Sequence, residues 1–259
     1  MRIAILTADE NIYLPAFFLR LFKNRDDIVA VFCTPPGHGK TNTRLALSKK
    51  YICAFGYWNF FHLMLRTIFT KSADVLGFSN SLRAYSVPSA ANVFRIPCEL
   101  IDAVNDSAFL ERLKAMEIDL IVSVSCPQIF RKNLIAIPKW GCLNIHGAPL
   151  PNYRGLLPSF WMMAKGEIEA AVTVFFVNEG IDSGDVVVME RFAIDPEESL
   201  DQFLTRSKQL HCDALVRAIN LIEQGIARPY PLDTAGGSYF GFPTRADFRE
   251  FRLRGRKIW

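Results

Sequence analysis

Short, continuously apolar runs alternate with segments of helical periodicity along the first half of the chain. Each run has the length of a strand and becomes polar only at its ends, which is typical of strands covered on both faces of a parallel sheet. The runs are residues 2–8, 26–34, 119–125 and 141–145, and helical spacing occurs at 14–22 and 107–117. This alternation predicts an α/β fold with a doubly wound, mostly parallel sheet.

The second half of the chain has a different order of elements. Residues 170–178 and 185–194 are two strand-like runs joined by a turn that contains glycine, which predicts an antiparallel hairpin. A long helix is predicted over 199–225, because Ser199 can cap its start and Gly225 can end it.

Length and composition fit a globular protein. The chain has 259 residues, of which half are apolar and 22% are charged. We expect one large domain over residues 1–225 and a short C-terminal extension over 226–259. The six cysteines include no C-x-x-C pair and the N-terminus lacks a signal-peptide pattern, so we expect reduced thiols and a cytoplasmic protein.

The positive charge is concentrated in the tail. The formal net charge is +4, and residues 245–259 carry the same net charge by themselves. The remainder is balanced and lacks the excess of Lys and Arg expected for a broad nucleic-acid-binding face. The tail is interpreted either as a solvated arm or as a segment that docks an anionic partner.

Residues 45–71 do not fit a minimal α/β plan. They are crowded with aromatic side chains, and no Asp or Glu occurs between positions 28 and 73. A narrow polar stripe recurs at helical spacing in this segment, at Asn59, His62, Arg66 and Thr70. A transmembrane helix here would place strands of one sheet on opposite sides of a bilayer, so we reject that interpretation. We expect an insertion of buried helices or a homodimer contact, with contact to a membrane surface as the alternative, and a structural role for His62.

Two common nucleotide-binding motifs are missing. The sequence GHGKT at 37–41 resembles the end of a phosphate-binding loop, but the glycine required earlier in that motif is Thr34. The turn after the first strand has no glycine, which excludes the dinucleotide fingerprint.

Polar side chains follow two neighbouring strands, at the edge of the sheet where ligands of α/β proteins bind. Asn144 and His146 alternate along one strand, so their side chains point the same way and can hold a carbonyl oxygen and transfer a proton. Asp182 lies in the Gly-flanked turn of the hairpin, where an aspartate is most often a turn former. Three further polar residues lie in loops near this edge, Ser125, Gln128 and Arg154.

Together these segments resemble the formyltransferases that use N10-formyltetrahydrofolate, a family that includes enzymes acting on methionyl-tRNA, glycinamide ribonucleotide and sugar nucleotides. The resemblance rests on the sequences NIHGAPLPNYRG and EGIDSG and on the spacing between them. It is specific over residues 119–195, and it departs from many members at Ala148, where they have serine.

The resemblance implies the catalytic residues and the co-substrate. Asn144 and His146 would donate hydrogen bonds to the oxygen of the transferred formyl group, and Asp182 would orient His146 and relay protons. No metal is required. The folate would lie along residues of the 125–129 loop and of the Asp182 turn, namely Ser125, Cys126, Gln128, Ile129 and Ile181.

The acceptor is expected to be a small primary amine, with a nucleotide-linked amino sugar preferred. Residues that could bind it are Arg154, Tyr239, Phe240, Phe242 and Arg245, by stacking on a base or pairing with a diphosphate. Only 34 residues follow Gly225, too few for the C-terminal barrel of the tRNA enzyme. Nucleic acid is therefore not the preferred partner.

Other readings of the function stay open. The first alternative is a methionyl-tRNA formyltransferase that lacks the barrel domain. The second is a non-catalytic protein that binds folate or a partner, and a hydrolase acting on the formyl donor is a further one.

Overall fold

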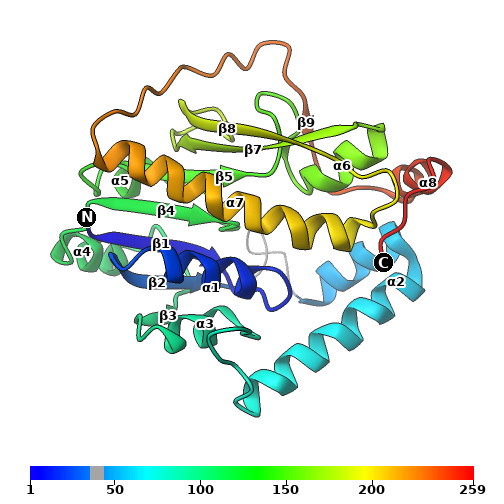
Figure 1. Ribbon diagram of the computed structural model, residues 1–259, viewed down its shortest axis with the longest axis horizontal. Coiled ribbons are helices and arrows are strands. Elements are labelled where there is room, and N and C mark those ends of the chain that lie inside the picture. The colour runs from blue at the N-terminus through cyan, green and yellow to red at the C-terminus, as the bar shows by residue number, and fades with distance from the viewer. Residues whose placement is uncertain (36–43) are drawn as a thin grey trace.

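The computed structural model describes residues 1–35 and 44–259, so the GHGKT sequence lies outside the described residues (Figure 1). Within the described ranges the main sheet has seven strands in the order β3-β2-β1-β4-β5-β7-β8. Its strands are β1 (Ile3–Ala8), β2 (Ile28–Thr34), β3 (Cys98–Leu100), β4 (Leu120–Val124), β5 (Cys142–His146), β7 (Glu169–Phe176) and β8 (Val186–Ala193).

The sheet confirms the predicted fold class. Strands β1 to β5 pair in parallel, whereas β7 pairs antiparallel with β5 and with β8. The predicted hairpin therefore closes one edge of the parallel sheet. The short strand β3 was not predicted, because Glu99 and Leu100 are exposed and leave no apolar run to detect.

Helices cover both faces of the sheet, as a doubly wound fold requires. Helices α1 (Leu14–Asn24), α3 (Val87–Val93) and α7 (Leu200–Glu223) lie over one face, and α4 (Ser107–Ala115) and the short α5 (Lys132–Ile135) lie over the other. Alternate residues of β1 enter the two cores, with Ile5 on the α1 side and Leu6 on the α4 side. Phe17 is 1% exposed in the first core, a burial that stabilises the fold by about 2 kcal/mol.

Helix α2 (Arg44–Val75) breaks at Gly56, whose φ of 82° interrupts the helical backbone. Before the break, Phe55 is buried and contacts Phe160 of α6 (Pro158–Lys165). After it, Tyr57 is 80% exposed and Trp58 is 76% exposed. The expectation of buried helices is therefore wrong for the part after Gly56, whereas the alternative of a homodimer contact stays a prediction. No helix in the described ranges is long and apolar enough to span a membrane.

The segment after α7 crosses the molecule and returns to the site (Figure 1). It runs beside β8, where Tyr230 forms a bridge with Val186, and then forms β9 (Tyr239–Phe240), which pairs with β6 (Arg154–Gly155). It ends in α8 (Arg245–Leu253), whose Phe251 is fully buried against Phe160. The extension thus shares a hydrophobic core with α6 and α7.

Candidate active site

Asn144 and His146 lie at the carboxyl end of β5 on the same face of the sheet. Cys142 packs in the core on the α4 side and Leu143 in the core on the α7 side, so the alternation of the strand places Asn144 and His146 on the α4 side. In the register of the sheet, Asn144 lies opposite Ser123 of β4. Among the residues that the structure describes, none hydrogen-bonds the side-chain amide of Asn144, which leaves it available to a ligand.

The imidazole of His146 is held in one orientation. Its Nε2 donates to the carbonyl oxygen of Tyr153 at 2.7 Å, and the side chain is buried. Its Nδ1 lies 3.7 Å from Oδ2 of Asp182, within ion-pair distance when the ring is protonated. Of the predicted trio, His146 and Asp182 therefore face each other through Nδ1 and the carboxylate, and Asn144 lies two residues earlier on the same strand.

Asp182 is presented by a loop that folds back over β5 from the β7–β8 hairpin. Its φ is 47°, a left-handed conformation that Asp tolerates, and its Oδ2 accepts a hydrogen bond from the backbone N–H of Gly155 at 3.0 Å. Asn178 ties the loop together: its Oδ1 accepts from the N–H of Gly180 at 3.0 Å and from the hydroxyl of Ser183 at 2.8 Å. Sequence reasoning missed Asn178, although an Asn two residues before Gly is a signal for such a turn.

A second histidine lies directly behind the carboxyl end of β5. His211 of α7 contacts Gly147 so closely that a Cβ on Gly147 would lie 2.8 Å from its Nε2. Nδ1 of His211 donates to the carbonyl oxygen of Ser207, which leaves Nε2 without a proton in the neutral ring. Burial, together with the positive charge of Lys208, lowers the pKa of His211 to about 3.

This low pKa predicts a contribution to acid sensitivity. An unfolded chain protonates His211 near its ordinary pKa of about 6.5, whereas the folded protein does so only near 3. Stability is therefore lost as pH falls from about 6.5 to 3, by up to about 1.4 kcal/mol per pH unit. Urea unfolding at several pH values should show a smaller acid slope for His211→Gln than for the wild type, and equal slopes would contradict the burial of a neutral ring.

The residues predicted to line the folate site lie in the loop after β4 and in the turn that holds Asp182, and the structure gives them different environments. Ser125 follows β4 with a φ of 53°. The side-chain amide of Gln128 forms two hydrogen bonds with the neighbouring loop. Its oxygen accepts from the N–H of Val104, and its nitrogen donates to the carbonyl oxygen of Asp102. Its side chain therefore positions the loop. Burial raises the pKa of Cys126 to about 11, so its thiol stays protonated at neutral pH.

Apolar side chains and a groove adjoin these loops. Ile129 and Ile181 are exposed by 61% and 48%, although both are large and apolar. A groove of about 500 Å³ begins two residues before Asp182, between α5 and the hairpin loop. It is lined by Lys132, Ile135, Val177, Asn178, Glu179 and Gly180. This groove was not predicted, because it forms between segments that are distant in the sequence.

The residues predicted to bind the acceptor divide into two groups. Arg154 and Tyr239 pair in the β6–β9 ribbon, beside the Gly155 that contacts Asp182. Tyr239 is 56% exposed, and the buried Nε of Arg154 has no hydrogen-bond partner in the described ranges. Phe242, in contrast, packs against Tyr51 and Phe55 of α2. Phe242 therefore supports the docking of the extension, and Arg245 is exposed at the start of α8.

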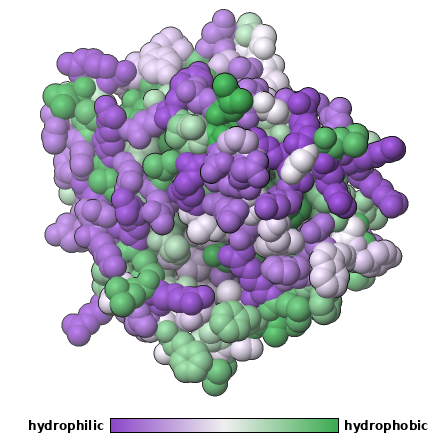
Figure 2. Space-filling view, turned by 45° about the vertical axis from the view of Figure 1, so that its right-hand side comes forward, coloured by the Kyte–Doolittle hydropathy of each residue, from purple (hydrophilic) through white to green (hydrophobic). Residues whose placement is uncertain are grey.

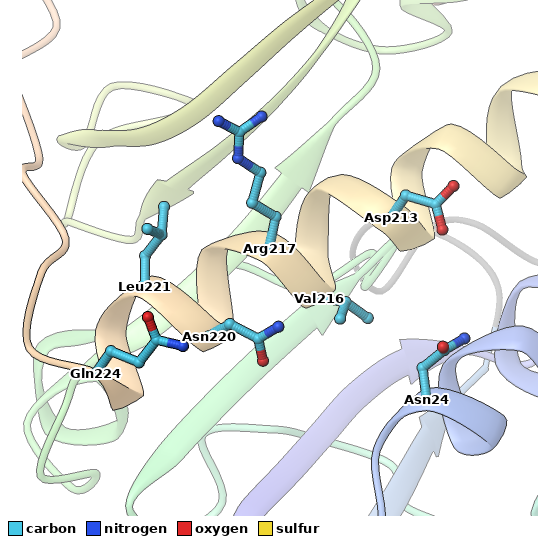
Figure 3. Close-up of a pocket in the computed structure, with 7 residues that line it drawn as sticks. All are labelled: Asn24, Asp213, Val216, Arg217, Asn220, Leu221 and Gln224. Carbon is cyan, nitrogen blue, oxygen red and sulfur yellow. The ribbon is translucent and has the colours of Figure 1, made fainter.

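Other candidate sites are weaker. The described residues include no group of three or more His, Cys, Asp or Glu side chains placed to hold a metal ion. A depression of about 270 Å³ lies between α1 and α7 (Figure 3). Its charged lining residues are already paired, Asp213 with Arg20 and Arg217 with Glu190. The charged side chains of this depression are therefore not free to take part in catalysis.

Comparisons with known proteins place the site in a family context. The family model described as "Formyl transferase" matches residues 61–219, which include the trio. The methionyl-tRNA formyltransferase of Syntrophus aciditrophicus is 36% identical over 175 residues, which cover 68% of this chain and 56% of that protein. The chain spans about half the length of the curated relatives it matches.

Solved structures share the fold at low sequence identity. Phosphoribosylglycinamide formyltransferase from Streptococcus pneumoniae superposes with a TM-score of 0.59 at 16% identity, covering 86% of this chain and 98% of that chain. A sugar N-formyltransferase from a Shewanella species superposes with a TM-score of 0.58 at 16% identity, covering 98% of this chain and 87% of that chain.

Proposed function

The chain belongs to the formyl transferase family, and from this we propose that it transfers a formyl group from N10-formyltetrahydrofolate to a primary amine of a small molecule. The observation that carries the proposal is the connection of the buried His146 to Asp182 beside the available amide of Asn144. This arrangement supplies a hydrogen-bond donor, a proton carrier and a carboxylate at one edge of the sheet. Acyl transfer to an amine requires these three groups.

Each residue of the trio has a distinct task in this reaction. The side-chain amide of Asn144 donates to the formyl oxygen as it gains negative charge during attack by the amine. Because Nε2 of His146 already donates to Tyr153, Nδ1 donates to the same oxygen in the doubly protonated form of the ring. Oδ2 of Asp182, 3.7 Å from Nδ1, orients the ring and receives the proton that the amine must lose. That proton finally reaches the departing folate nitrogen, as the new C–N bond replaces the old one.

The formyl donor fits the loops around the trio. The exposed side chains of Ile129 and Ile181 can cover the faces of a pterin ring, and burying them on a ligand removes apolar surface from water. Lys132 in the adjoining groove can pair with the carboxylates of the glutamate end of folate. The backbone of residues 125–129, whose Gln128 is anchored to Val104, supplies further polar groups to a bound folate.

A nucleotide-linked amino sugar is the acceptor that we favour. The orphaned Nε of Arg154 and the exposed ring of Tyr239 lie on the ribbon that also contacts Asp182 through Gly155. A diphosphate would satisfy the guanidinium and a base could stack on the phenol ring, with the amine held near Asp182. The similarity to methionyl-tRNA formyltransferase favours charged tRNA as the second candidate.

The test is the release of tetrahydrofolate, followed by absorbance, with a panel of acceptors. We expect turnover with a 3-amino or 4-amino nucleotide sugar, and a KM for that sugar raised about tenfold or more in Arg154→Gln. The matched control is Arg228→Gln, at an exposed arginine outside the β6–β9 ribbon, which should leave this KM unchanged.

Three other outcomes would contradict parts of this proposal. Turnover only with methionyl-tRNA would overturn the acceptor and keep the chemistry. Consumption of the donor without any amine would identify a hydrolase. Folate binding without turnover on the whole panel, including tRNA, would favour a non-catalytic binding protein.

A further inference from the structure

Helix α2 after Gly56 turns one row of polar side chains toward the protein. Arg66 forms an ion pair with Asp201 of α7, and its guanidinium lies 5.9 Å from the ring centre of Trp259. The ring of His62 lies 4.3 Å from that of Trp259, and Thr70 is only 8% exposed. These residues recur at intervals of four, so one polar face of the helix is directed at the body of the molecule.

The opposite face of the same helix is apolar and exposed. Its side chains are exposed by between 39% and 87%, and they recur at intervals of three and four. This apolar stripe consists of Tyr57, Trp58, Phe61, Met64, Leu65, Ile68, Phe69 and Val75. It continues into the following turn through Leu76, Phe78 and Leu82.

The orientation of α2 is thus the reverse of a surface helix in a soluble protein, which buries its apolar face. Hydrophobic side chains gather along the lower edge of the space-filling view, where α2 lies (Figure 2). A contiguous exposed apolar patch of this kind marks an interaction site.

The charge around the stripe indicates the partner. Between Asp27 and Glu99 the only acidic residue is Asp74, whereas eight residues are Lys or Arg. Lys71 and Arg83 are exposed at the margins of the stripe. The basic helix α8 packs beside the first part of α2, where Phe248 contacts Phe55. The charge around the apolar stripe is therefore predominantly positive, with Asp74 as the acidic exception.

We propose that the apolar stripe of α2 binds the surface of a membrane that contains anionic lipids, with the helix lying in the plane of the interface. Trp58 and Tyr57 have the amphipathic rings that are favoured at the level of the headgroups, and Lys71 and Arg83 can pair with lipid phosphates. A second copy of the chain fits less well, because it would bring the same basic margins against each other.

The test is sedimentation with vesicles made of equal parts phosphatidylglycerol and phosphatidylcholine. We expect the wild-type protein to sediment with them, and to bind much more weakly to phosphatidylcholine alone and at high salt. Ile68→Glu, in the stripe, should weaken binding by roughly tenfold or more. Lys71→Gln should weaken it by about fivefold, the equivalent of one basic residue at an anionic surface. Fluorescence from Trp58 should shift to the blue on binding, a shift that Trp58→Phe removes.

A matched control separates this proposal from nonspecific binding through any exposed apolar side chain. Ile226 is 51% exposed, close to the 54% of Ile68, and comes three residues after α7. The end of α7 lies on the side of the molecule away from α2 (Figure 1). Ile226→Glu should bind vesicles as the wild type does. Equal loss in both variants, or no binding by the wild type, would overturn the proposal. Light scattering that shows a dimer, broken by Ile68→Glu in a protein that does not bind vesicles, would assign the stripe to a second copy.

Discussion

Turnover of the formyl donor should fall about a thousandfold in His146→Ala and roughly a hundredfold in Asn144→Ala. The loss of one preorganised donor to a developing oxyanion costs about 10² to 10³ in rate, and His146 also carries a proton. Because both residues act on the transition state, kcat should fall while the KM of the donor changes little. Steady-state kinetics with the best acceptor, monitored by release of tetrahydrofolate, measures both constants.

The double variant and a second histidine supply the controls. The loss of kcat in the double variant Asn144→Ala/His146→Ala should not exceed the product of the losses in the two single variants. Two donors that share one oxygen act as a unit, so their effects do not multiply beyond this limit. His62→Ala changes a ring that contacts Trp259 outside the site, so its turnover should equal that of the wild type. A His146→Ala protein that keeps a tenth of the wild-type kcat would exclude His146 from the chemistry.

Six of the seven strands of the main sheet could be predicted from the sequence, because each of them, unlike β3, is an apolar run whose length matches a buried strand. The prediction missed β9 and α8, where no such run exists and where the structure depends on tertiary contacts, as with Phe251 against Phe160. Asn144, His146 and Asp182 were recognised through a family resemblance, since each residue type alone is common at strand ends and turns.

The remaining features of the site depend on distances that no local pattern encodes. His211 reaches Gly147 from α7, and Arg154 meets Tyr239 only because the extension returns across the molecule. For α2, the sequence showed a polar stripe at Asn59, His62, Arg66 and Thr70 and could not say which face meets solvent. A polar stripe has the same sequence pattern whether it faces water or, as here, pairs with Asp201. The pattern therefore did not show which face of α2 is exposed, and the expectation of buried helices was wrong after Gly56.

Replacing Gly184 by alanine should disrupt the loop that holds Asp182. A Cβ at this position would lie 1.6 Å from the carbonyl oxygen of Phe176 and 2.8 Å from its carbonyl carbon. These are backbone atoms of β7, and the N–H of Phe176 donates to the carbonyl oxygen of Asp185. Because this bond joins the two strands, neither backbone can move away from the added Cβ without opening the hairpin. We expect Gly184→Ala to lower the free energy of unfolding by about 3 kcal/mol and Tm by roughly 10 °C.

The matched control is Gly241→Ala, because no atom lies within 4 Å of the Cβ it would add. Thermal unfolding should show a Tm for this variant close to that of the wild type. An unchanged Tm in Gly184→Ala would contradict the close approach of the two strands.

Kinetics well below Tm then separates stability from positioning. Asp182 lies two residues before Gly184, and its Oδ2 must stay near both Nδ1 of His146 and the N–H of Gly155. If the close turn sets that position, folded Gly184→Ala should have a kcat at least about tenfold below the wild type, since misplacement of a catalytic group by about 1 Å has effects of this size. A folded variant with full kcat and a lowered Tm would show that the turn contributes to stability alone and that Asp182 is positioned by its contact with Gly155.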